Sequence, residues 1–512
     1  MRITNNMMLR NASSNINGNK INVNAMENQM SSQKKIQRPS DDPVIAVRAL
    51  RLRSSLSEIN QYYENNIPDA ESWLEVTETA LKNMEKILTD IRTQCEYGSG
   101  DQLTADDRKA ILTALEKLRQ QVYSEGNADY AGRTVFTGYR TNQKLTFMQD
   151  DASTKYEITQ KFTYADLEEY RYYSDKVTVP ATPGDLLNPA NTVPNPQEAV
   201  FQRIRLSYGK IDSLDNAGSL SYSYTDNTGT VQTSPITVTE YETFEEWKAQ
   251  AGNYTIADGE AVFIKESGEL IMSKGLSDDI RENKGSLELN YTKTGFAKGE
   301  VRPEYYYNCK DVTNPDPDKQ IEYTKFDANG KEIYQDINYL VAANQTLTVN
   351  TQASDVFDAS LGRDVDALIE AVRFAQEANA KVEEIEKMQK MQEYSSDDSQ
   401  AALEEWLVAA KKEAAYAEDN MQKLYNSYIG NCDGYLSKVL LAKTSVGSKG
   451  ESLELTKNRM ENQQTTVETL KSENEDRELS DIIIDYTAAY SAYEASLQAA
   501  AKINQNTLLN FI

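Results

Sequence analysis

The stretch Leu479-Ser-Asp-Ile-Ile-Ile-Asp-Tyr-Thr-Ala-Ala-Tyr-Ser-Ala-Tyr-Glu-Ala-Ser-Leu-Gln-Ala-Ala-Ala-Lys502 decides the fold of this 512-residue chain. Its apolar side chains recur at intervals of four and three residues, which is the spacing of a coiled-coil seam. No Gly or Pro interrupts the sequence from Glu451 onward, and the chain ends in an apolar tail. We therefore predict a terminal helix that packs against other helices. The seam consists of Leu479, Ile483, Tyr486, Tyr490, Tyr493, Leu497 and Ala500, and the tail of Leu508, Leu509, Phe511 and Ile512.

The opposite end of the chain carries a second, weaker heptad pattern. Apolar residues recur there every seven positions, with Ala12, Asn19 and Met26 at the companion positions. A thin apolar stripe that includes Asn makes a marginal helix, because helix nucleation is costly. We predict that the terminal segments 1–39 and 472–512 are disordered in the monomer and form axial helices of a coiled coil in an assembly. The predicted assembly interface combines the seven seam residues with Leu9, Ile16, Val23 and Met30.

Composition excludes several classes of function. The net charge of −26 disfavours nucleic-acid binding by the whole chain, because phosphates would repel it. The basic balance of residues 1–60 leaves open a nucleic-acid or membrane arm, although a solvated helix face is the simpler interpretation. The chain has no histidine, which removes His-based catalytic triads and His-ligated metals. Its three cysteines, Cys95, Cys309 and Cys432, form no CxxC pattern, and Cys95 falls in step with buried apolar positions.

Motifs for enzyme chemistry are also missing from the sequence. There is no Gly-rich phosphate loop, and the acidic stretch Asp311–Asp318 lacks the central Gly and the terminal Glu of a calcium loop. We therefore predict no catalytic, cofactor-binding or metal-binding residues. The first residues lack the apolar core of a signal peptide, and no apolar run reaches the ~18–20 residues that cross a bilayer. The expectation is a protein without membrane insertion that is exported without a cleaved signal peptide.

The middle of the chain divides two helical regions. Arg38-Pro-Ser-Asp-Asp-Pro-Val44 is a break, after which Ser40 or Asp41 is predicted to cap a helix with Pro43 in its first turn. Helical patterns then fill residues 40–145, with an interruption or kink at Pro68.

Residues 146–344 show alternating apolar residues and turn signals, which predict one or two inserted β-rich outer domains. Helical periodicity returns over residues 345–471, including an added helical hairpin near 391–435. The polar stretch Ser472–Glu478 is predicted to be a stutter or a joint between two helical segments. The predicted fold class is α+β, with an elongated helical bundle and coiled-coil core built from both termini.

Five strings of residues resemble one known family. Met1-Arg-Ile-Thr-Asn-Asn-Met-Met8 and Gln37-Arg-Pro-Ser-Asp-Asp-Pro43 resemble the start of flagellar hook-associated protein three, a junction protein of the flagellin-like family. Gly132-Arg-Thr-Val-Phe-Thr-Gly-Tyr-Arg-Thr141 resembles the family's strand after its second helix. Gln345-Thr-Leu-Thr-Val-Asn350, with Ser354-Asp-Val-Phe-Asp358, resembles its return to the helical domain, and Tyr493–Ile503 resembles its ending. Residues 146–344 match no family that we identify.

The resemblance implies a structural role in the bacterial flagellum, outside the cell, at the hook–filament junction. Its implied partners are further copies in a ring, the other junction protein, flagellin and a cytoplasmic export chaperone of the flagellar type III system. We interpret Tyr486, Tyr490, Tyr493 and Leu497 as a candidate chaperone surface. Two other readings stay open: a flagellin that forms the filament, and a surface adhesin or glycan-binding module carried by the insertion.

Overall fold

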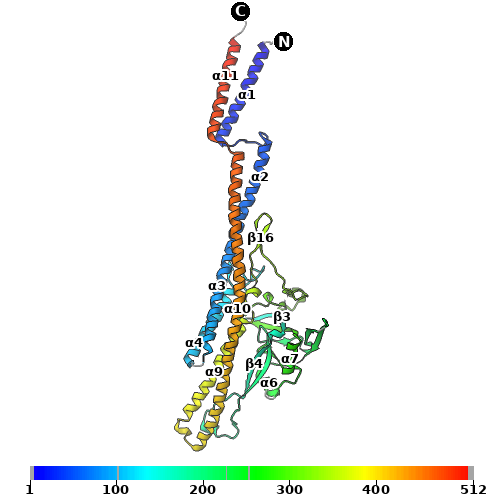
Figure 1. Ribbon diagram of the computed structural model, residues 1–512, viewed down its shortest axis with the longest axis vertical. Helices are drawn as coiled ribbons and strands as arrows, with labels where there is room; N and C mark the ends of the chain where they lie inside the picture. The colour runs from blue at the N-terminus through cyan, green and yellow to red at the C-terminus, as the bar shows by residue number, and fades with distance from the viewer. Residues whose placement is uncertain (1–4, 101–102, 227, 252–253, 506–512) are drawn as a thin grey trace, which may run out of the picture. The chain divides into compact units, whose positions relative to one another are not determined.

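Both ends of the described chain are long helices that lie side by side in opposite directions (Figure 1). The computed structural model describes residues 5–100, 103–226, 228–251 and 254–505. Helix α1 (Asn5–Ser32) and helix α11 (Leu479–Gln505) are each about 40 Å long at ~1.5 Å per residue. The predicted apolar tail of Leu508, Leu509, Phe511 and Ile512 lies outside the described residues.

The chain forms two compact units. The first contains residues 1–71, 338–347 and 450–512, and the second contains residues 72–337 and 348–449. Long helices enter both units, whereas the five-stranded and seven-stranded β-sheets belong to the second unit. Helical ends with a β-rich middle confirm the predicted α+β class.

A π-helical turn marks the place of the predicted kink. Helix α2 (Pro43–Asn60) passes through η1 (Gln61–Asn66) into α3 (Ile67–Gly98) without a break. Pro68 has no N–H group, and its ring crowds the carbonyl of residue 64, so a regular turn cannot form there. The widened turn just before Pro68 relieves this conflict while the helix continues.

Helix α10 (Asp397–Glu475) runs for 79 residues, and three residues separate its end from the start of α11. The gap at 476–478 lies within the predicted joint Ser472–Glu478, whereas residues 472–475 still belong to α10. The hairpin prediction was inaccurate: α9 (Leu361–Met388) is one arm, the turn contains η6 (Gln392–Tyr394), and α10 is the other arm. Residues 391–435 are therefore not a hairpin by themselves. The tip buries Trp406 and Tyr394 with Val177 and Leu186 from the β-rich region, and these contacts fix the turn.

The helices of the second unit share an apolar core. A capping box of Thr104 and Asp107 begins α4 (Ala105–Gly126), which lies against α9. The face of α3 that enters this core is fully buried, and Cys95 is part of it, as its sequence spacing predicts. The largest buried side chains of this face are Trp73, Leu81, Met84, Leu88 and Ile91.

The β-rich region contains a five-stranded sheet covered by one short helix. Its strand order is β4-β5-β11-β10-β9, and only the β9–β10 pair is parallel. Helix α6 (Phe244–Ala251) places Trp247, which is fully buried, against the side chains of Tyr172 and Ile264. The strands are β4 (Glu168–Ser174), β5 (Gln197–Arg205), β9 (Thr237–Tyr241), β10 (Glu260–Ile264) and β11 (Glu269–Met272).

A second sheet has the order β14-β13-β3-β12-β7-β8, with β6 paired to β12. The alternating apolar residues of this region, near 220–224, 262–264, 270–272 and 287–291, all lie in or next to strands. The turn between β10 and β11 needs glycine: Gly268 has φ +62°, and a Cβ there would lie 2.2 Å from the Tyr208 carbonyl oxygen. The strands are β3 (Asp151–Thr163), β6 (Ser213–Leu214), β7 (Ser221–Thr225), β8 (Val231–Pro235), β12 (Ser286–Phe296), β13 (Asn308–Asp311) and β14 (Ile321–Tyr323).

Two hairpins and several short helices complete the described elements. The hairpins pair β1 with β2 and β15 with β16. Their strands are β1 (Asp129–Tyr130), β2 (Arg133–Thr134), β15 (Asn338–Ala342) and β16 (Gln345–Thr348). The short helices are α5 (Pro183–Leu186), α7 (Lys274–Glu282), α8 (Ala353–Val356) and the 3-10 turns Tyr164–Asp166, Ala217–Ser219, Pro303–Tyr305 and Pro317–Lys319.

Candidate functional site

Helices α1 and α11 pack along a heptad seam. Asn19 of α1 donates its side-chain amide to the Ala492 carbonyl oxygen at 3.2 Å, so this polar group is satisfied beside the seam. Spacings of four and three residues on both helices give the side-chain contacts of an antiparallel coiled coil. The half-buried residues on α1 include Ala12, Ile16, Asn19, Val23, Met26 and Met30. On α11 the series begins with the fully buried Ile482 and continues with the half-buried Tyr486, Ala489, Tyr493, Ser496, Ala500 and Ile503.

The structure divides the predicted interface residues into two groups. Six of them lie in the packed seam: Ile16, Val23, Met30, Tyr486, Tyr493 and Ala500. The other five are exposed: Leu9 by 38%, Leu479 by 44%, Ile483 by 47%, Tyr490 by 43% and Leu497 by 42%. Within this chain the predicted α11 seam was therefore shifted, because Ile482, Ala489 and Ser496 face α1 in place of Ile483, Tyr490 and Leu497. Contact of the exposed five with other subunits stays a prediction.

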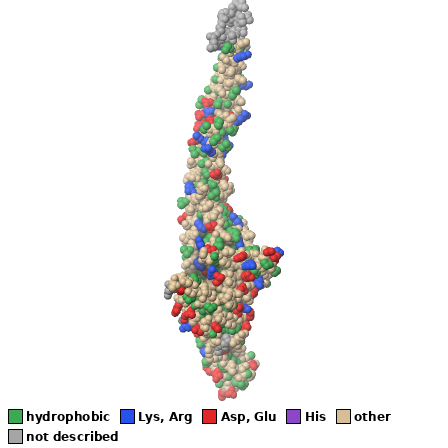
Figure 2. Space-filling view, turned by 90° about the vertical axis from the view of Figure 1, so that its right-hand side faces the viewer, with side chains coloured by type: hydrophobic (Ala, Val, Ile, Leu, Met, Phe, Trp, Pro, Cys, Tyr) green, Lys and Arg blue, Asp and Glu red, His purple; other side chains and the backbone are tan. Residues whose placement is uncertain are grey.

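Helix α11 therefore presents an apolar flank that α1 does not cover. We call Leu479, Ile483, Tyr490 and Leu497 the open flank. It lies beside the column of Tyr486, Tyr493 and Ala500, and the Tyr486 and Tyr490 rings stack with centroids 6.0 Å apart. Figure 2 shows hydrophobic side chains at the surface of the terminal helices, between charged ones. Contiguous exposed apolar surface of this kind is typical of interaction sites.

A network of ion pairs holds the joint between α10 and α11. Arg53 of α2 donates two hydrogen bonds to the Glu475 carboxylate, at 2.7 and 2.6 Å, and the Lys34 ammonium lies 3.6 Å from it. Lys34 also pairs with Asp476. Two backbone hydrogen bonds join the linkers: Lys35 N–H to the Glu475 carbonyl at 2.7 Å, and Arg477 N–H to the Gln33 carbonyl at 3.0 Å. The sequence predicted the position of this joint but none of its charged contacts.

Charge pairing shifts the titration of the joint. Hydrogen bonding and attraction from Arg53 hold the pKa of Glu475 below its ordinary value of 4.5. Lys34 lowers the pKa of Asp476 in the same way, and its own pKa is raised in return. The joint is thus held by charges that persist at neutral pH.

The helix-cap prediction was wrong by one residue. Asp42, not Ser40 or Asp41, is the N-cap of α2, and its carboxylate accepts from the N–H groups of Val44 and Ile45 at 2.9 and 3.1 Å. Asp41 accepts instead from the backbone N–H groups of Gln37 and Arg38, at 3.1 and 2.9 Å, within the linker. The two adjacent aspartates thus stabilise the helix start and the preceding turn separately.

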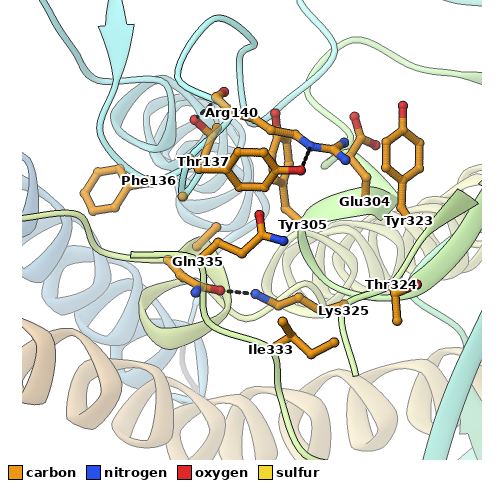
Figure 3. A pocket seen from close by; sticks show the side chains of 14 residues that line it. Phe136, Thr137, Arg140, Glu304, Tyr305, Tyr323, Thr324, Lys325, Ile333 and Gln335 are labelled. Atoms are coloured by element: carbon orange, nitrogen blue, oxygen red, sulfur yellow. Dashed lines mark hydrogen bonds between the residues drawn. The ribbon is translucent and has the colours of Figure 1, made fainter. Parts of the chain in front are cut away.

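The strings around residues 132–141 and 354–358 come together in the second unit. The Phe136 and Phe357 rings meet edge to face with centroids 5.0 Å apart, and Thr137 forms a β-bridge with Gln352. Beside this contact lies a hollow of about 60 Å³ (Figure 3), where the Arg140 guanidinium stands 4.1 Å from the Tyr323 ring centroid. A hollow of this volume holds about two waters. The contact is therefore a structural clamp between two strings that are far apart in sequence.

Burial shapes the electrostatics of this hollow. Glu304 lines it with only 8% of its surface exposed, and burial raises its pKa above the ordinary value of 4.5. The Arg302 guanidinium lies 3.8 Å from the carboxylate and opposes that rise. Across the described residues, the His, Cys, Asp and Glu side chains form no group of three that could hold a metal ion. Within the same residues, each helix is too short or too polar to span a membrane.

Comparison with known proteins finds similarity to flagellar proteins. Residues 3–141 match the family model of the bacterial flagellin N-terminal helical region. Flagellar hook-associated protein 3 of Salmonella typhimurium is 29% identical over 142 residues, which cover 28% of this chain and 44% of that protein. The Escherichia coli protein of the same name is 34% identical over 121 residues, covering 22% and 36%. These matches confirm the resemblance to flagellar hook-associated protein three.

A filament protein is similar over a comparable length. The flagellin of Clostridium tyrobutyricum is 30% identical over 122 residues, which cover 24% of this chain and 32% of that flagellin. The chain thus spans less than half the length of each of these relatives. The flagellar junction protein FlgL from Legionella pneumophila, a solved structure, is 11% identical, with a TM-score of 0.29 over 84% of this chain and 99% of that one.

Proposed function

We propose that this chain is a structural subunit of the bacterial flagellum that acts as a mechanical adaptor at the hook–filament junction. The observation that carries the proposal is the open flank of α11, which stays exposed after α1 has covered the neighbouring seam. The curated relatives named hook-associated protein 3 support the choice of the junction. Residues 1–39 and 472–512 would form the axial layer, residues 40–145 and 345–471 a surrounding bundle, and residues 146–344 the outer part.

The open flank supplies the energy for assembly. Completing the burial of its four half-exposed side chains contributes about 1 kcal/mol each, since full burial of such side chains is worth ~1.5–3 kcal/mol. A ring or helical array needs head-to-tail contacts between unlike surfaces, so the open flank meets a different surface of the next copy. The proposed neighbours are further copies, the other junction protein and flagellin. Nucleic acid is not among them, given the charge of −26.

The proposed chaperone surface is complete only when α11 is separated from α1. Tyr486 and Tyr493 are half-buried against α1, whereas Tyr490 and Leu497 remain exposed. A cytoplasmic export chaperone would therefore take the place of α1 on the seam as well as cover the open flank. This arrangement keeps the whole apolar face of α11 away from water until export.

Immunogold electron microscopy of intact flagella tests the proposed location. The antibody is raised against residues 146–344, which match no family that we identify. A single labelled band between hook and filament is the expected result. Absence of label from the flagellum would overturn the proposal.

A flagellin is the second candidate function. It is favoured by the similarity to a clostridial flagellin and by the flagellin N-terminal family model. Both candidates use the terminal helices in the same way, and neither requires catalysis. They differ in copy number, because a filament subunit covers the whole length of the appendage. Label along the entire filament in the same experiment would establish this alternative.

A further inference from the structure

Helices α3 and α10 run antiparallel in the second unit, and two ion pairs fix their register. The Lys443 ammonium lies 2.7 Å from the Glu85 carboxylate, and Arg92 Nε lies 2.8 Å from Asp433. Moving forward on α3 from residue 85 to residue 92 therefore corresponds to moving back on α10 from 443 to 433. The next turn of α3 must then face the part of α10 just before Asp433.

Two cysteines meet at that place. Cys95 is fully buried and Cys432 is 2% exposed, and the register that the two ion pairs set places them at the same level of the facing helices. The helices are close there, because a Cβ at Gly98 would lie 2.4 Å from the Tyr425 ring. All three cysteines of the chain are free and buried in the structure. Cys309 lies apart from the pair, in β13 of the second sheet.

We propose that Cys95 and Cys432 are a disulfide-forming pair that staples α3 to α10 when a small-molecule disulfide is present as the two helices pack. This modification site does not depend on the proposed flagellar function. The residues are 337 positions apart, so the bond would close a very long loop of the unfolded chain. Closing a long loop restricts the unfolded state strongly in the chain-entropy model.

The oxidant in the proposed reaction is a disulfide of the glutathione class. One cysteine thiolate attacks a sulfur of the oxidant, forms a mixed disulfide and releases one small thiol. The second cysteine thiolate then attacks the protein-bound sulfur of the mixed disulfide, forms the Cys95–Cys432 bond and releases the second small thiol. The two protons lost by the cysteines are taken up by the two small thiols, and the oxidant receives both electrons.

Burial restricts this reaction to the period in which the chain folds. Hydrogen bonding to Cys432 and loss of solvent raise the pKa of the Cys95 thiol well above its ordinary value of 9.0. The thiolate is the nucleophile, so the packed pair reacts slowly while it stays folded. The unfolded chain exposes both thiols to water and to the oxidant, and packing then brings them together. The bond therefore forms during folding and is protected afterwards.

Refolding of the full chain tests the proposal. Reduced protein is unfolded in denaturant and refolded either with a mixture of oxidised and reduced glutathione or with excess reductant. Free thiols are then alkylated and counted by mass spectrometry. We expect the count to fall from three to one only in the glutathione mixture, with a cross-linked peptide containing Cys95 and Cys432. Three remaining thiols, or a cross-link that includes Cys309, would overturn the proposal.

Matched variants separate the pair from the third cysteine. C309S keeps the pair and should retain no free thiol after oxidation, whereas C95S should retain two and yield no intramolecular cross-link. If C95S fails to fold, the wild-type chain and C309S still decide the question. Covalent dimers of C309S on a non-reducing gel, in place of the internal cross-link, would also contradict the proposal.

Discussion

A single carboxylate, Asp42, sets the first residue of α2. It satisfies two backbone N–H groups that have no partner within the helix. We expect D42A to reduce the free energy of unfolding of the transition that includes α2 by about 1 kcal/mol, the usual value for a lost N-cap. The measurement is urea unfolding followed by circular dichroism. S40A is the control and should change it by less than ~0.5 kcal/mol, because Ser40 is exposed and does not cap.

The cap position was available from the sequence. Ser40, Asp41 and Asp42 are all residue types that cap helices, so composition alone leaves three choices. Pro43 decides among them, because proline is favoured at the first helical position and the cap is then the residue just before it. The ion pair of Arg53 with Glu475 could not be found in this way, since 422 positions separate the two residues.

Substitutions at two isoleucines of α11 test which face of the helix packs against α1. Ile482 is fully buried, whereas Ile484, two positions later on the same helix, is 66% exposed. We expect I482A to destabilise the α1–α11 pair by about 2–4 kcal/mol, and I484A to change it by less than ~0.5 kcal/mol. Limited proteolysis of α1, followed by mass spectrometry, reports the opening of the pair. Equal protection of α1 in both variants would contradict the described packing.

The shifted seam has a simple physical cause. Ile482, Ile483 and Ile484 are consecutive, so a heptad pattern can begin at any of them. Starting from Ile483 collects the larger side chains Tyr490 and Leu497, whereas starting from Ile482 collects Ala489 and Ser496. Small residues permit close approach of the two helices, and this geometric condition outweighs the hydrophobicity that guides a sequence pattern. The existence and length of the helix could thus be predicted, but not the face that it turns to α1.

The joint between α10 and α11 should weaken in acid. The pKa of Glu475 is lowered in the folded chain, so its stabilising contribution is complete above the unfolded value of 4.5. The contribution is lost as the pH falls from 4.5 through the lowered folded pKa. R53M removes the main partner and should cost about 2 kcal/mol at pH 7. The difference in stability between wild type and R53M, measured by thermal unfolding from pH 7 to pH 3, should shrink on acidification.

Other carboxylates also titrate over this pH range. Their contributions cancel in the difference in stability between wild type and variant. R51M is the matched control, because Arg51 is an exposed arginine of the same helix. It should show a small difference from wild type that does not vary with pH. A constant difference for R53M over the whole range would show that Glu475 does not depend on Arg53.

At the scale of the whole molecule, the open flank predicts a defect in assembly without a defect in folding. Leu497 is 42% exposed in the packed pair, so L497E is accommodated by the single chain. In an assembly the same carboxylate would be buried against apolar surface, at a cost of several kcal/mol. We expect incorporation into flagella, measured by immunoblotting of purified appendages, to fall by about a hundredfold or more.

The neighbouring residue provides the control for this variant. Gln498 is an exposed polar residue next to Leu497 but outside the open flank, so Q498E adds the same charge at a different face. Its incorporation should match that of the wild-type chain. Normal incorporation of L497E would remove the open flank from the assembly interface. An equal loss in both variants would assign the effect to charge rather than to position.

Helical ends around a β-rich middle follow from periodicity, and so could be predicted. The single helix α10 could not, because Gly430, Gly434, Gly447 and Gly450 lie within it and glycine usually interrupts a helical pattern. Contacts along its length outweigh this intrinsic preference. The turn at residues 389–396 was misplaced for a related reason. The turn depends on contacts with Val177 and Leu186, which lie within the inserted region, far away in the sequence.

The two hydrogen-bonded linkers of the joint have a consequence for torque. A single linker between two helices can rotate about its backbone bonds and transmits little twist. Here two linkers lie side by side. They are joined by the Lys35–Glu475 and Arg477–Gln33 backbone hydrogen bonds and by the ion pair of Arg53 with Glu475. Rotation of the terminal helices about their common axis must therefore strain both linkers at once. Two linkers that are tied to each other therefore resist twisting more strongly than a single linker would.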